Sequence, residues 1–351
     1  MTPRGTDWGL ALLVAIAVAT GLGTWFAGSP GAAWVFGAHA VGGTVIAFAL
    51  VYKLRRVLPR LWARPDRRNA AGIAALGLVL AALGSGYVWA SAGKLSFGGF
   101  TLLAWHAALG GALALGVLAH ALLRAKPLRR RDAGDRRQFL TAVALGAGAL
   151  AVWQLQRPVQ RALGLPGRRR RFTGSYEAGS FRGNAFPSTS WVADRPRPVR
   201  ASGWTLAVDG LVERRLALTA AELDRGDELV ATLDCTGGFY STQRWRGVRL
   251  GRLLDEAGAA PEARHVRVIS RTGYRWSFDA GHARGLLLAT HVGDEPLSHD
   301  HGAPCRLVAP GRRGFQWVKW IDRVELHSEP DPGAVASTVL SSFSAAGRGA
   351  A

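Results

Sequence analysis

The chain has 351 residues and a formal net charge of +20, and 48% of its residues are hydrophobic. This length accommodates a membrane part and one soluble domain. The arginines cluster between apolar segments instead of following a motif with interleaved aromatic side chains, so the charge indicates membrane topology and argues against a nucleic-acid partner. The chain has two cysteines, in unlike surroundings, which does not favour a disulfide framework or a zinc site.

The N-terminal part contains apolar segments that predict transmembrane helices. Each has about the 17–25 apolar residues that a membrane-spanning helix needs. No Asp, Glu, Lys or Arg interrupts any of them, which argues against buried helices of a soluble protein. The segments are Trp8–Gly28, Ala33–Tyr52, Ala70–Ala90, Phe100–Leu123 and Phe139–Gln156. We therefore expect an all-α transmembrane bundle of about five helices over residues 1–157.

The loops between these segments indicate their orientation. Lys53–Asn69 and Arg124–Arg137 are rich in arginine, whereas the alternate loops, Gly28–Ala32 and Ser91–Gly99, hold only Lys94. Cytoplasmic loops of membrane proteins carry the excess of Lys and Arg. The two basic loops are therefore predicted to be cytoplasmic, so the chain is a multi-pass protein of the cytoplasmic membrane and leaves the fifth segment on the outer side.

A second basic region bears on the location of the C-terminal domain. Arg157, Arg161 and Arg168–Arg171 directly follow the fifth segment and would favour a cytoplasmic end. However, Asp135–Leu140 contains Arg-Arg and precedes the Ala/Gly-rich Thr141–Val152, and this resembles a twin-arginine export signal. Such signals carry folded proteins across the membrane. We therefore expect an extracytoplasmic C-terminal domain; an ordinary basic helix flank is the alternative.

Histidines inside the predicted membrane segments indicate a haem. His39 and His106 each lie about seven residues from the outer end of a segment, and therefore about 10 Å below the outer surface. Equal depth on two helices is what a bis-histidine haem needs. His120 lies on the same face as His106, but the matching position on the second segment is Lys53, which does not ligate haem. The pattern resembles membrane b-type cytochromes and predicts one outer haem b, with His39 and His106 as iron ligands. Hydrogen bonds between helices are the alternative.

A soluble domain is predicted to follow a basic linker at residues 158–180 and to cover residues 181–329. Trp204–Gly210 alternates apolar and polar residues like a strand, and Thr219 with Glu222 predicts a capping box. Further strands are expected at His265–Ser270, Leu286–Thr290, Cys305–Ala309 and Ile321–His327, with a short helix at Leu250–Ala257. Short strands mixed with short helices predict an α+β domain. Residues 330–351, rich in Ala, Ser and Gly, predict a disordered tail.

The stretch Leu233–Gly247 contains the most informative residue of this domain, Cys235. The preceding Glu228–Leu233 is apolar and β-prone, so Cys235 is expected where a strand gives way to the turn Thr236–Gly238. A thiolate at a strand end, beside glycines that allow a large ligand to approach, suits a soft metal. A small buried hydrophobe is the alternative. Cys305, the second cysteine, is expected to pack in the core.

Several motifs follow Cys235 in a fixed order. They are Trp245–Gly247, Leu250–Leu254, Ser270–Tyr274, His301–Leu307 and Pro310–Trp320. This series resembles the molybdopterin-binding domain of the sulfite oxidase family. Within that family it is most similar to the bacterial branch that includes periplasmic methionine sulfoxide reductase. The resemblance covers roughly residues 180–328.

The resemblance implies roles for individual residues. In that family a cysteine ligates molybdenum through its thiolate, beside the two dithiolene sulfurs of the pterin, and Cys235 takes its position. Contacts to the molybdenum-molybdopterin cofactor are implied for Asn184, Ser270, His301, Arg306, Trp317, Val318 and Lys319. An arginine fork such as Arg306 suits an anionic phosphate. Taken singly, His301 also fits a turn cap, Arg306 a surface ion pair and Lys319 a solvated strand residue.

The substrate pocket is less clearly marked in the sequence. Sulfite oxidases follow the cysteine with Ala-Gly-Asn, where this chain has Thr236–Tyr240. We assign Tyr240 and Arg244 as candidate catalytic side chains that donate a hydrogen bond to an oxo ligand or to substrate. Packing beneath the cofactor is the alternative for both.

The sequence thus predicts a membrane-anchored molybdenum-molybdopterin oxidoreductase with an extracytoplasmic active domain. Oxygen-atom transfer to or from a small oxyanion or sulfoxide-type substrate is expected, with electrons passing through the haem b. The expected partners are membrane lipid and a quinone or another redox partner. One alternative is a haem-free anchor with a separate electron partner, and another is a non-catalytic binding protein that has kept the fold.

Overall fold

The computed structural model describes residues 2–63, 70–124, 127, 129, 136–190, 194 and 196–341 of the chain. Two compact units make up the chain, Met1–Tyr176 and Glu177–Ala351. The division between them falls within residues 158–180, the segment expected to be a basic linker.

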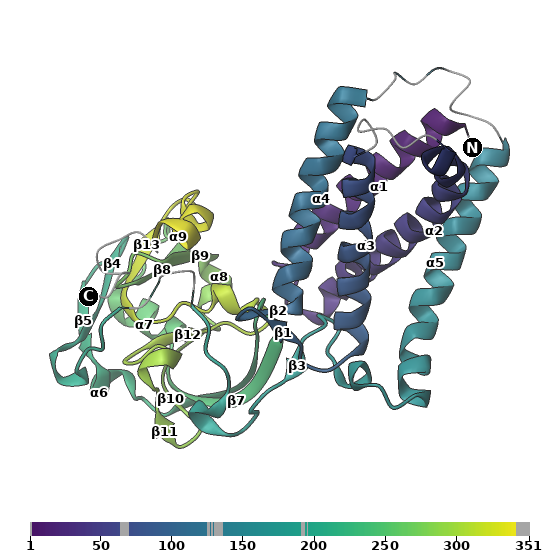
Figure 1. The fold of residues 1–351 in the computed structure, drawn as a ribbon. Coiled ribbons are helices and arrows are strands. Elements are labelled where there is room, and N and C mark those ends of the chain that lie inside the picture. Colours follow the sequence, from purple (N-terminus) through teal and green to yellow (C-terminus); the bar gives the residue numbers. More distant parts are fainter. Residues whose placement is uncertain are drawn as a thin grey trace. The chain divides into compact units, whose positions relative to one another are not determined.

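Long helices form the first unit (Figure 1). They are α1 (Pro3–Gly23), α2 (Ala33–Ala63), α3 (Ala70–Ser91), α4 (Leu102–Arg124) and α5 (Arg136–Ala162). Within the described residues, these five helices are long and apolar enough to cross a membrane, by length and composition. Each overlaps one of the predicted segments, so the helices are confirmed, whereas their insertion into a membrane remains a prediction. Contacts join α1 to α2, α3 to α4 and α2 to α5.

Short elements connect α1 to α2 and α3 to α4. A 3-10 turn, η1 (Pro30–Ala32), precedes α2, and a two-stranded hairpin of β1 (Ser96–Phe97) and β2 (Phe100–Thr101) precedes α4. The first predicted cytoplasmic loop, Lys53–Asn69, is helical over residues 53–63, where α2 continues, and residues 64–69 lie outside the described residues. Much of the second loop, Arg124–Arg137, with Asp135 of the predicted export signal, also lies outside them. The positive-inside topology and the twin-arginine signal therefore remain predictions.

The end of the first unit packs against the C-terminal end of α3. α5 continues to Ala162, and the turn η4 (Pro166–Arg169) follows it. The side-chain amide of Gln160 donates to the carbonyl of Ala90 at 3.1 Å. A side chain at Gly167 would collide with that carbonyl, at 2.3 Å from a built Cβ. Residues expected to form a linker therefore belong to the fold of the first unit.

The second unit contains two sheets. The first has the order β11–β10–β7–β3, with β6 on β7 and β12 on β10. Its strands are β3 (Tyr176–Glu177), β6 (Asp227–Asp234), β7 (Phe239–Arg249), β10 (Leu287–Val292), β11 (Glu295–Pro296) and β12 (Arg306–Val308). The second has the order β5–β4–β13–β8–β9. Its strands are β4 (Thr205–Gly210), β5 (Leu216–Thr219), β8 (His265–Ser270), β9 (Arg275–Asp279) and β13 (Ile321–His327).

Short helices complete this mixed unit and confirm the expected α+β pattern. They are α6 (Ala220–Leu223), α7 (Leu250–Ala257), α8 (Ala280–Ala283) and α9 (Ala334–Leu340), with 3-10 turns η5 (Gly183–Ala185), η6 (Ala201–Gly203), η7 (His299–His301) and η8 (Gly314–Gln316). The capping box at Thr219 is present, with both reciprocal hydrogen bonds. The predicted bounds of α7, β8 and β13 are confirmed. α7 ends at Gly258, whose φ of 65° is the left-handed conformation that glycine adopts freely at helix ends.

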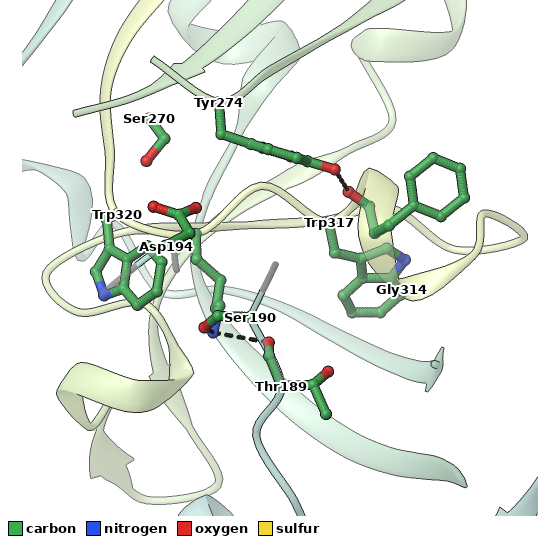
Figure 2. A pocket seen from close by; sticks show the side chains of 10 residues that line it. Thr189, Ser190, Asp194, Ser270, Tyr274, Gly314, Trp317 and Trp320 are labelled. Atoms are coloured by element: carbon green, nitrogen blue, oxygen red, sulfur yellow. Dashed lines mark hydrogen bonds between the residues drawn. The ribbon is translucent and has the colours of Figure 1, made fainter. Parts of the chain in front are cut away.

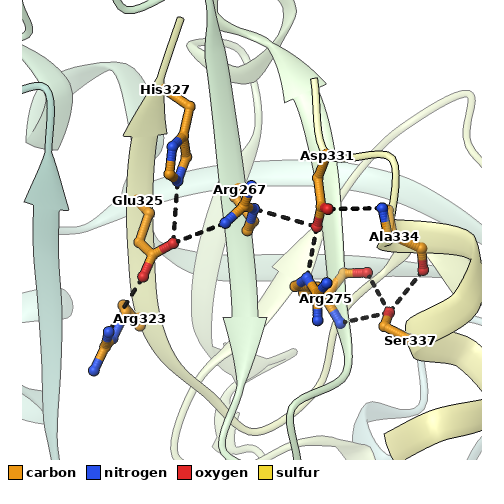
Figure 3. A network of polar contacts seen from close by, with 9 residues as sticks. Arg267, Arg275, Arg323, Glu325, His327, Asp331, Ala334 and Ser337 are labelled. Carbon is orange, nitrogen blue, oxygen red and sulfur yellow. Dashed lines mark hydrogen bonds and ion pairs between the residues drawn. The ribbon is translucent and has the colours of Figure 1, made fainter. Parts of the chain in front are cut away.

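The C-terminal segment differs from the expectation. A disordered tail from residue 330 is wrong for residues 331–341, which are ordered and contain α9. Asp331 forms ion pairs with Arg267 at 3.2 Å and Arg275 at 2.6 Å (Figure 3). The Ser337 hydroxyl donates to the Arg275 carbonyl at 3.0 Å. The Ala/Ser/Gly-rich composition predicted disorder because composition contains no information about the contacts of one residue, here the buried carboxylate of Asp331 between two arginines. Residues 342–351 lie outside the described residues.

Candidate functional site

A small pocket in the second unit gathers residues from several separate segments (Figure 2). Its walls come from the loop after η5, from the end of β8 and from the loop between β12 and β13. The lining residues are Thr189, Ser190, Asp194, Ser270, Tyr274, Gly314, Phe315, Trp317, Lys319 and Trp320. Hydroxyl, carboxylate, ammonium and indole groups therefore converge on one small space.

Cys235 lies beside this pocket, at the predicted transition from strand to turn. β6 ends at Asp234, and the Gly238 N–H donates to the Cys235 carbonyl at 3.0 Å. Gly238 has a φ of 98°, which favours glycine at this turn position. The thiol sulfur accepts from the Gly237 N–H at 3.3 Å and lies 3.3 Å from the hydroxyl of the pocket residue Thr189. The sulfur is therefore held at the pocket wall by a backbone donor and a hydroxyl.

A buried ion pair fixes the backbone around Cys235. Arg313 donates to the Asp234 carboxylate at 2.6 Å and to the Cys235 carbonyl at 3.2 Å. The side chains of Arg313 and Asp234 are 4% and 2% exposed. Arg313 belongs to the Pro310–Trp320 motif, but the motif alone gave no reason to pair it with Asp234.

Arg306 is a fully enclosed cation next to the pocket. It is 3% exposed and its guanidinium lies 5.1 Å from the Trp245 ring and 5.8 Å from the Trp317 ring. One terminal nitrogen donates to the His301 carbonyl at 3.0 Å, whereas Nε is buried without a hydrogen-bond partner among the described residues. Burial lowers the pKa of Arg306 to about 9. Among the described residues, no carboxylate forms an ion pair with it.

Lys319 brings a second cation to the pocket. Its ammonium donates to the carbonyls of Asp300 at 2.9 Å and Thr189 at 3.1 Å and to the Ser190 hydroxyl at 3.0 Å. Burial, and then the charge of Arg306, lowers the pKa of Lys319 to about 7. A group with this pKa is poised to become fully charged when an anion enters the pocket.

His301 acts on the site through the backbone. Its Nε2 lies 2.9 Å from the Phe186 carbonyl and its Nδ1 lies 2.7 Å from the Ser298 hydroxyl. A carbonyl only accepts, so Nε2 carries the hydrogen and Nδ1 accepts from the hydroxyl. Burial lowers the pKa of His301 to about 4, so the ring is neutral at pH 7. Both ring nitrogens are used within the protein, and the His301 carbonyl orients Arg306.

The other predicted cofactor contacts divide into two groups. Ser270 and Trp317 line the pocket, and Val318 is fully buried, with its carbonyl accepting from Leu307 N–H at 2.8 Å. Asn184 does not line the pocket. Its side chain instead donates to the Pro296 carbonyl and accepts from a backbone N–H, each at 2.9 Å, and so fixes the loop after β11.

The predicted catalytic roles of Tyr240 and Arg244 require correction. Along β7, buried and half-buried residues alternate, and Trp245, which contacts Arg306, is on the buried side. Successive side chains of a strand point to opposite faces, so Tyr240 and Arg244 lie on the face away from Trp245. Arg244 forms an ion pair with the exposed Asp294. Neither side chain lines the pocket.

Asp194 is a pocket residue that the sequence reasoning did not select. It is 5% exposed, and one carboxylate oxygen accepts from the Thr272 hydroxyl at 3.4 Å. The other oxygen is buried without a hydrogen-bond partner among the described residues. Burial raises the pKa of Asp194. No motif or periodicity marked this position, since it lies in an irregular segment before the first predicted strand.

These residues fit an anionic cofactor that needs a thiolate ligand. Cys235 offers the sulfur, and its glycine-rich turn leaves room for a bulky group. Arg306 retains a buried N–H without a partner, which a phosphate oxygen would satisfy. Trp317 and Trp320 add flat apolar surfaces to the pocket wall. Cys305, by contrast, is fully buried, and burial raises the pKa of its thiol, as expected for a core residue.

The first unit brings together the two predicted haem ligands. The rings of His39 and His106 have their centres 5.9 Å apart and are nearly perpendicular, at 86°. Nδ1 of His39 lies 2.9 Å from the Ala17 carbonyl, and Nδ1 of His106 lies 2.9 Å from the Ala82 carbonyl. Each Nδ1 therefore carries the hydrogen, which leaves Nε2 with the lone pair that a metal requires. His120, in contrast, is exposed.

Comparison with known proteins agrees with the chemistry of the pocket. Residues 193–335 match the family described as the oxidoreductase molybdopterin binding domain. The chain is 30% identical over 179 residues to the protein-methionine-sulfoxide reductase catalytic subunit MsrP of Gluconobacter oxydans, covering 45% of this chain and 55% of that protein. It is 31% identical over 160 residues to the NADPH nitrate reductase of Beauveria bassiana, covering 36% and 18%. It is 31% identical over 140 residues to the mitochondrial sulfite oxidase of Drosophila melanogaster, covering 34% and 24%. The chain thus spans about half, or less, of the length of these relatives.

Proposed function

We propose, from the match of residues 193–335 to the oxidoreductase molybdopterin binding domain and from the likeness to MsrP and to sulfite oxidase, that the chain is a membrane-anchored molybdoenzyme of the sulfite oxidase family. Its active domain would lie outside the cytoplasmic membrane and exchange electrons with a haem b in its own helices. The observation that carries the proposal is the pocket itself. The pocket has aromatic walls and the half-buried Lys319, with the Cys235 thiol and the buried Arg306 beside it, and no carboxylate of the described residues forms an ion pair with either cation.

Each pocket residue has a defined task in this proposal. Cys235 would supply a thiolate to molybdenum, because thiolates are the ligands that soft metal sites prefer. Arg306 and Lys319 would hold the phosphate of the pterin, with Ser270 and Trp317 along its side. The bound centre would supply two-electron oxygen-atom transfer. Asp194, whose pKa burial raises, is placed to exchange a proton with a group in the pocket.

The names of the relatives indicate the substrate class. They are a methionine sulfoxide reductase, a nitrate reductase and a sulfite oxidase. A small oxyanion or a sulfoxide is therefore the proposed substrate here.

The first unit supports the membrane part of the proposal. Large apolar side chains cover the outward faces of its helices, among them Leu12, Leu80, Leu115 and Leu118. Such surfaces suit contact with lipid. The rings of His39 and His106 are neighbours, with Nε2 atoms that accept no hydrogen bond from the described residues, and a metal–imidazole distance of about 2 Å would need these atoms about 4 Å apart. The ring separation of 5.9 Å is compatible with a metal between them. A quinone or another redox partner would complete the electron path.

The decisive experiment measures molybdenum and haem together. The full chain is purified from a host that makes molybdopterin, and both contents are determined per protein, with a reduced-minus-oxidised spectrum. About one of each would support the proposal. Molybdenum without haem would indicate a haem-free anchor with a separate electron partner. Protein without molybdenum from this host would indicate a non-catalytic binding protein that has kept the fold.

A separate measurement tests location. A reporter fused after Glu329 is expected to read extracytoplasmic, and one fused after Arg60 cytoplasmic. Replacing Arg136 and Arg137 by lysine is expected to block export of the second unit. Unchanged export in this variant would mean that the arginine pair is an ordinary basic helix flank and not an export signal.

A further inference from the structure

Two buried donors without a partner lie at the C-terminal end of α3, Trp89 within the helix and Arg170 in the segment after η4 that packs against it. Arg170 is 8% exposed and Trp89 is 4% exposed. Nε of Arg170 and Nε1 of Trp89 are both buried without a hydrogen-bond partner among the described residues. The guanidinium carbon of Arg170 lies 4.2 Å from the centre of the Trp89 ring, so the two groups are neighbours. Each unmet buried donor costs about 1–3 kcal/mol.

The remaining donors of Arg170 hold it firmly in place. Its terminal nitrogens donate to the carbonyls of Gly174 at 2.7 Å and of Ala92 and Gly93 at 3.0 Å each. The contacts to Ala92 and Gly93 hold the segment around Arg170 against the C-terminal end of α3. They use only carbonyl oxygens, so the positive charge has no counter-charge in them. Burial lowers the pKa of Arg170, which reflects the cost of keeping this charge away from water.

Among the described residues of the first unit, no carboxylate is paired with this cation. Residues 1–176 contain no Glu, and their acidic residues are Asp7, Asp66, Asp132 and Asp135. Among these, Asp7 is the one that the structure describes, and it lies 2.9 Å from Lys53. A buried arginine is normally paired. The counter-charge of Arg170 is therefore expected to come from a bound molecule.

The position of Trp89 on α3 indicates on which side of this helix the bound molecule would lie. Ala82 and Gly86 of α3 contact His106: the Ala82 carbonyl accepts from its ring, and a Cβ at Gly86 would meet the ring at 3.0 Å. Residues three, four and seven apart share one face of a helix. Trp89 therefore lies on the face of α3 that meets His106, about one turn or 5 Å nearer the outer end.

From this arrangement we infer that Arg170 and Trp89 bind a propionate carboxylate of the haem held by His39 and His106. The inference rests on the haem of the proposed function. A haem carries two propionates on one edge, and a carboxylate accepts hydrogen bonds from both an indole N–H and a guanidinium N–H. Trp89 and Arg170 would thus turn this edge toward the outer end of the helices and fix the rotation of the ring between its two axial ligands.

The haem midpoint potential tests this assignment without any assay of turnover. A nearby cation disfavours the ferric state, which carries one more positive charge than the ferrous state. Arg170→Gln is therefore expected to retain the bis-histidine spectrum and to shift the ferrous–ferric equilibrium about tenfold toward ferric, a fall of about 59 mV for a one-electron couple. Trp89→Phe keeps the ring beneath Arg170 and removes only the N–H, so it should shift the potential in the same direction by less. Arg171→Gln, which removes a neighbouring charge, is the matched control and should change the potential little.

Haem with esterified propionates distinguishes the source of the anion. In protein loaded with the dimethyl ester, Arg170→Gln should cause no further shift, because the two changes remove the same interaction. An undiminished shift in the ester-loaded protein would show that a lipid headgroup is the anion and would overturn the inference. Haem at full content with unchanged potentials in Arg170→Gln and Trp89→Phe would also overturn it, while leaving the proposed function intact. A wild-type protein without haem would overturn both.

Discussion

Replacing Arg306 by methionine is expected to have opposite effects on the empty and the loaded protein. A pKa of about 9 means that the fold holds this guanidinium charged at a cost of roughly 4–5 kcal/mol, at about 1.4 kcal/mol for each unit of pKa. The methionine variant is free of that cost. It also loses the hydrogen bond to the His301 carbonyl and the contacts to two indoles, worth about 2–4 kcal/mol together.

The cofactor-free protein should therefore become more stable in Arg306→Met, by up to about 3 kcal/mol. For a unit of this size the melting temperature would rise by up to about 12 °C. The loaded protein should lose one charge-assisted hydrogen bond to the phosphate, worth about 1.5–3 kcal/mol, and so retain the cofactor about 10- to 100-fold less tightly. Arg306→Lys, which keeps a charge, is the control.

Two preparations are needed for this comparison, one from a host that lacks molybdopterin synthesis and one from a competent host. Thermal unfolding of the first and molybdenum content of the second after gel filtration give the two effects. The reasoning fails if Arg306→Met lowers the melting temperature of the empty protein by several degrees, or if molybdenum is retained as in the wild type. Either result would mean that Arg306 is a structural residue whose charge is compensated within the chain.

Further predictions concern the metal ligand, the C-terminal segment and the haem. Cys235→Ser replaces a soft thiolate by a hydroxyl and should abolish turnover while the circular dichroism spectrum stays unchanged; full turnover would exclude the molybdenum assignment. Burial favours a raised pKa for Asp331, but hydrogen bonds from an arginine and a backbone N–H, with two arginine charges, lower it overall. Its contribution to stability is therefore present above about pH 4, the pKa of an unfolded Asp, and is lost as the pH falls further. Asp331→Asn should destabilise the protein by about 1–3 kcal/mol at pH 7 and match the wild type in acid denaturation below about pH 3. His39→Ala and His106→Ala should both lose the haem absorbance and His120→Ala should keep it; loss only in the last would mean that another axial pair binds the iron.

Local patterns in the sequence were sufficient for much of the second unit. The alternation of apolar and polar residues located β4, and the capping box at Thr219 located α6. The same period of two, applied to β7, would have shown that Tyr240 and Arg244 cannot share a face with Trp245. Tyr240 and Arg244 were selected because they are close to Cys235 in sequence, without asking which face of the strand each side chain lies on.

Other features depend on contacts between distant segments. Asp194 reaches the pocket from an irregular segment, and Asp331 is fixed by arginines of β8 and β9, so no local pattern marks either one. The equal positions of His39 and His106 along their helices agree with the 5.9 Å between their rings, whereas the carbonyls that bind their Nδ1 atoms are on other helices. A repeated Ala-x-x-[Ser/Thr]-Gly pattern precedes both histidines, at 17–21 and 82–86, and is a usable signal.

The ammonium group of Lys319 links the filling of the pocket to pH. With a pKa of about 7, this side chain is about half protonated in the empty protein at pH 7. A dianionic phosphate beside it would draw the group to full protonation, so Lys319 would take up about half a proton near neutrality. The Cys235 thiol would release a proton on becoming the thiolate ligand of a metal. The two changes oppose each other, so the pH dependence of loading is set by their difference and not by Lys319 alone.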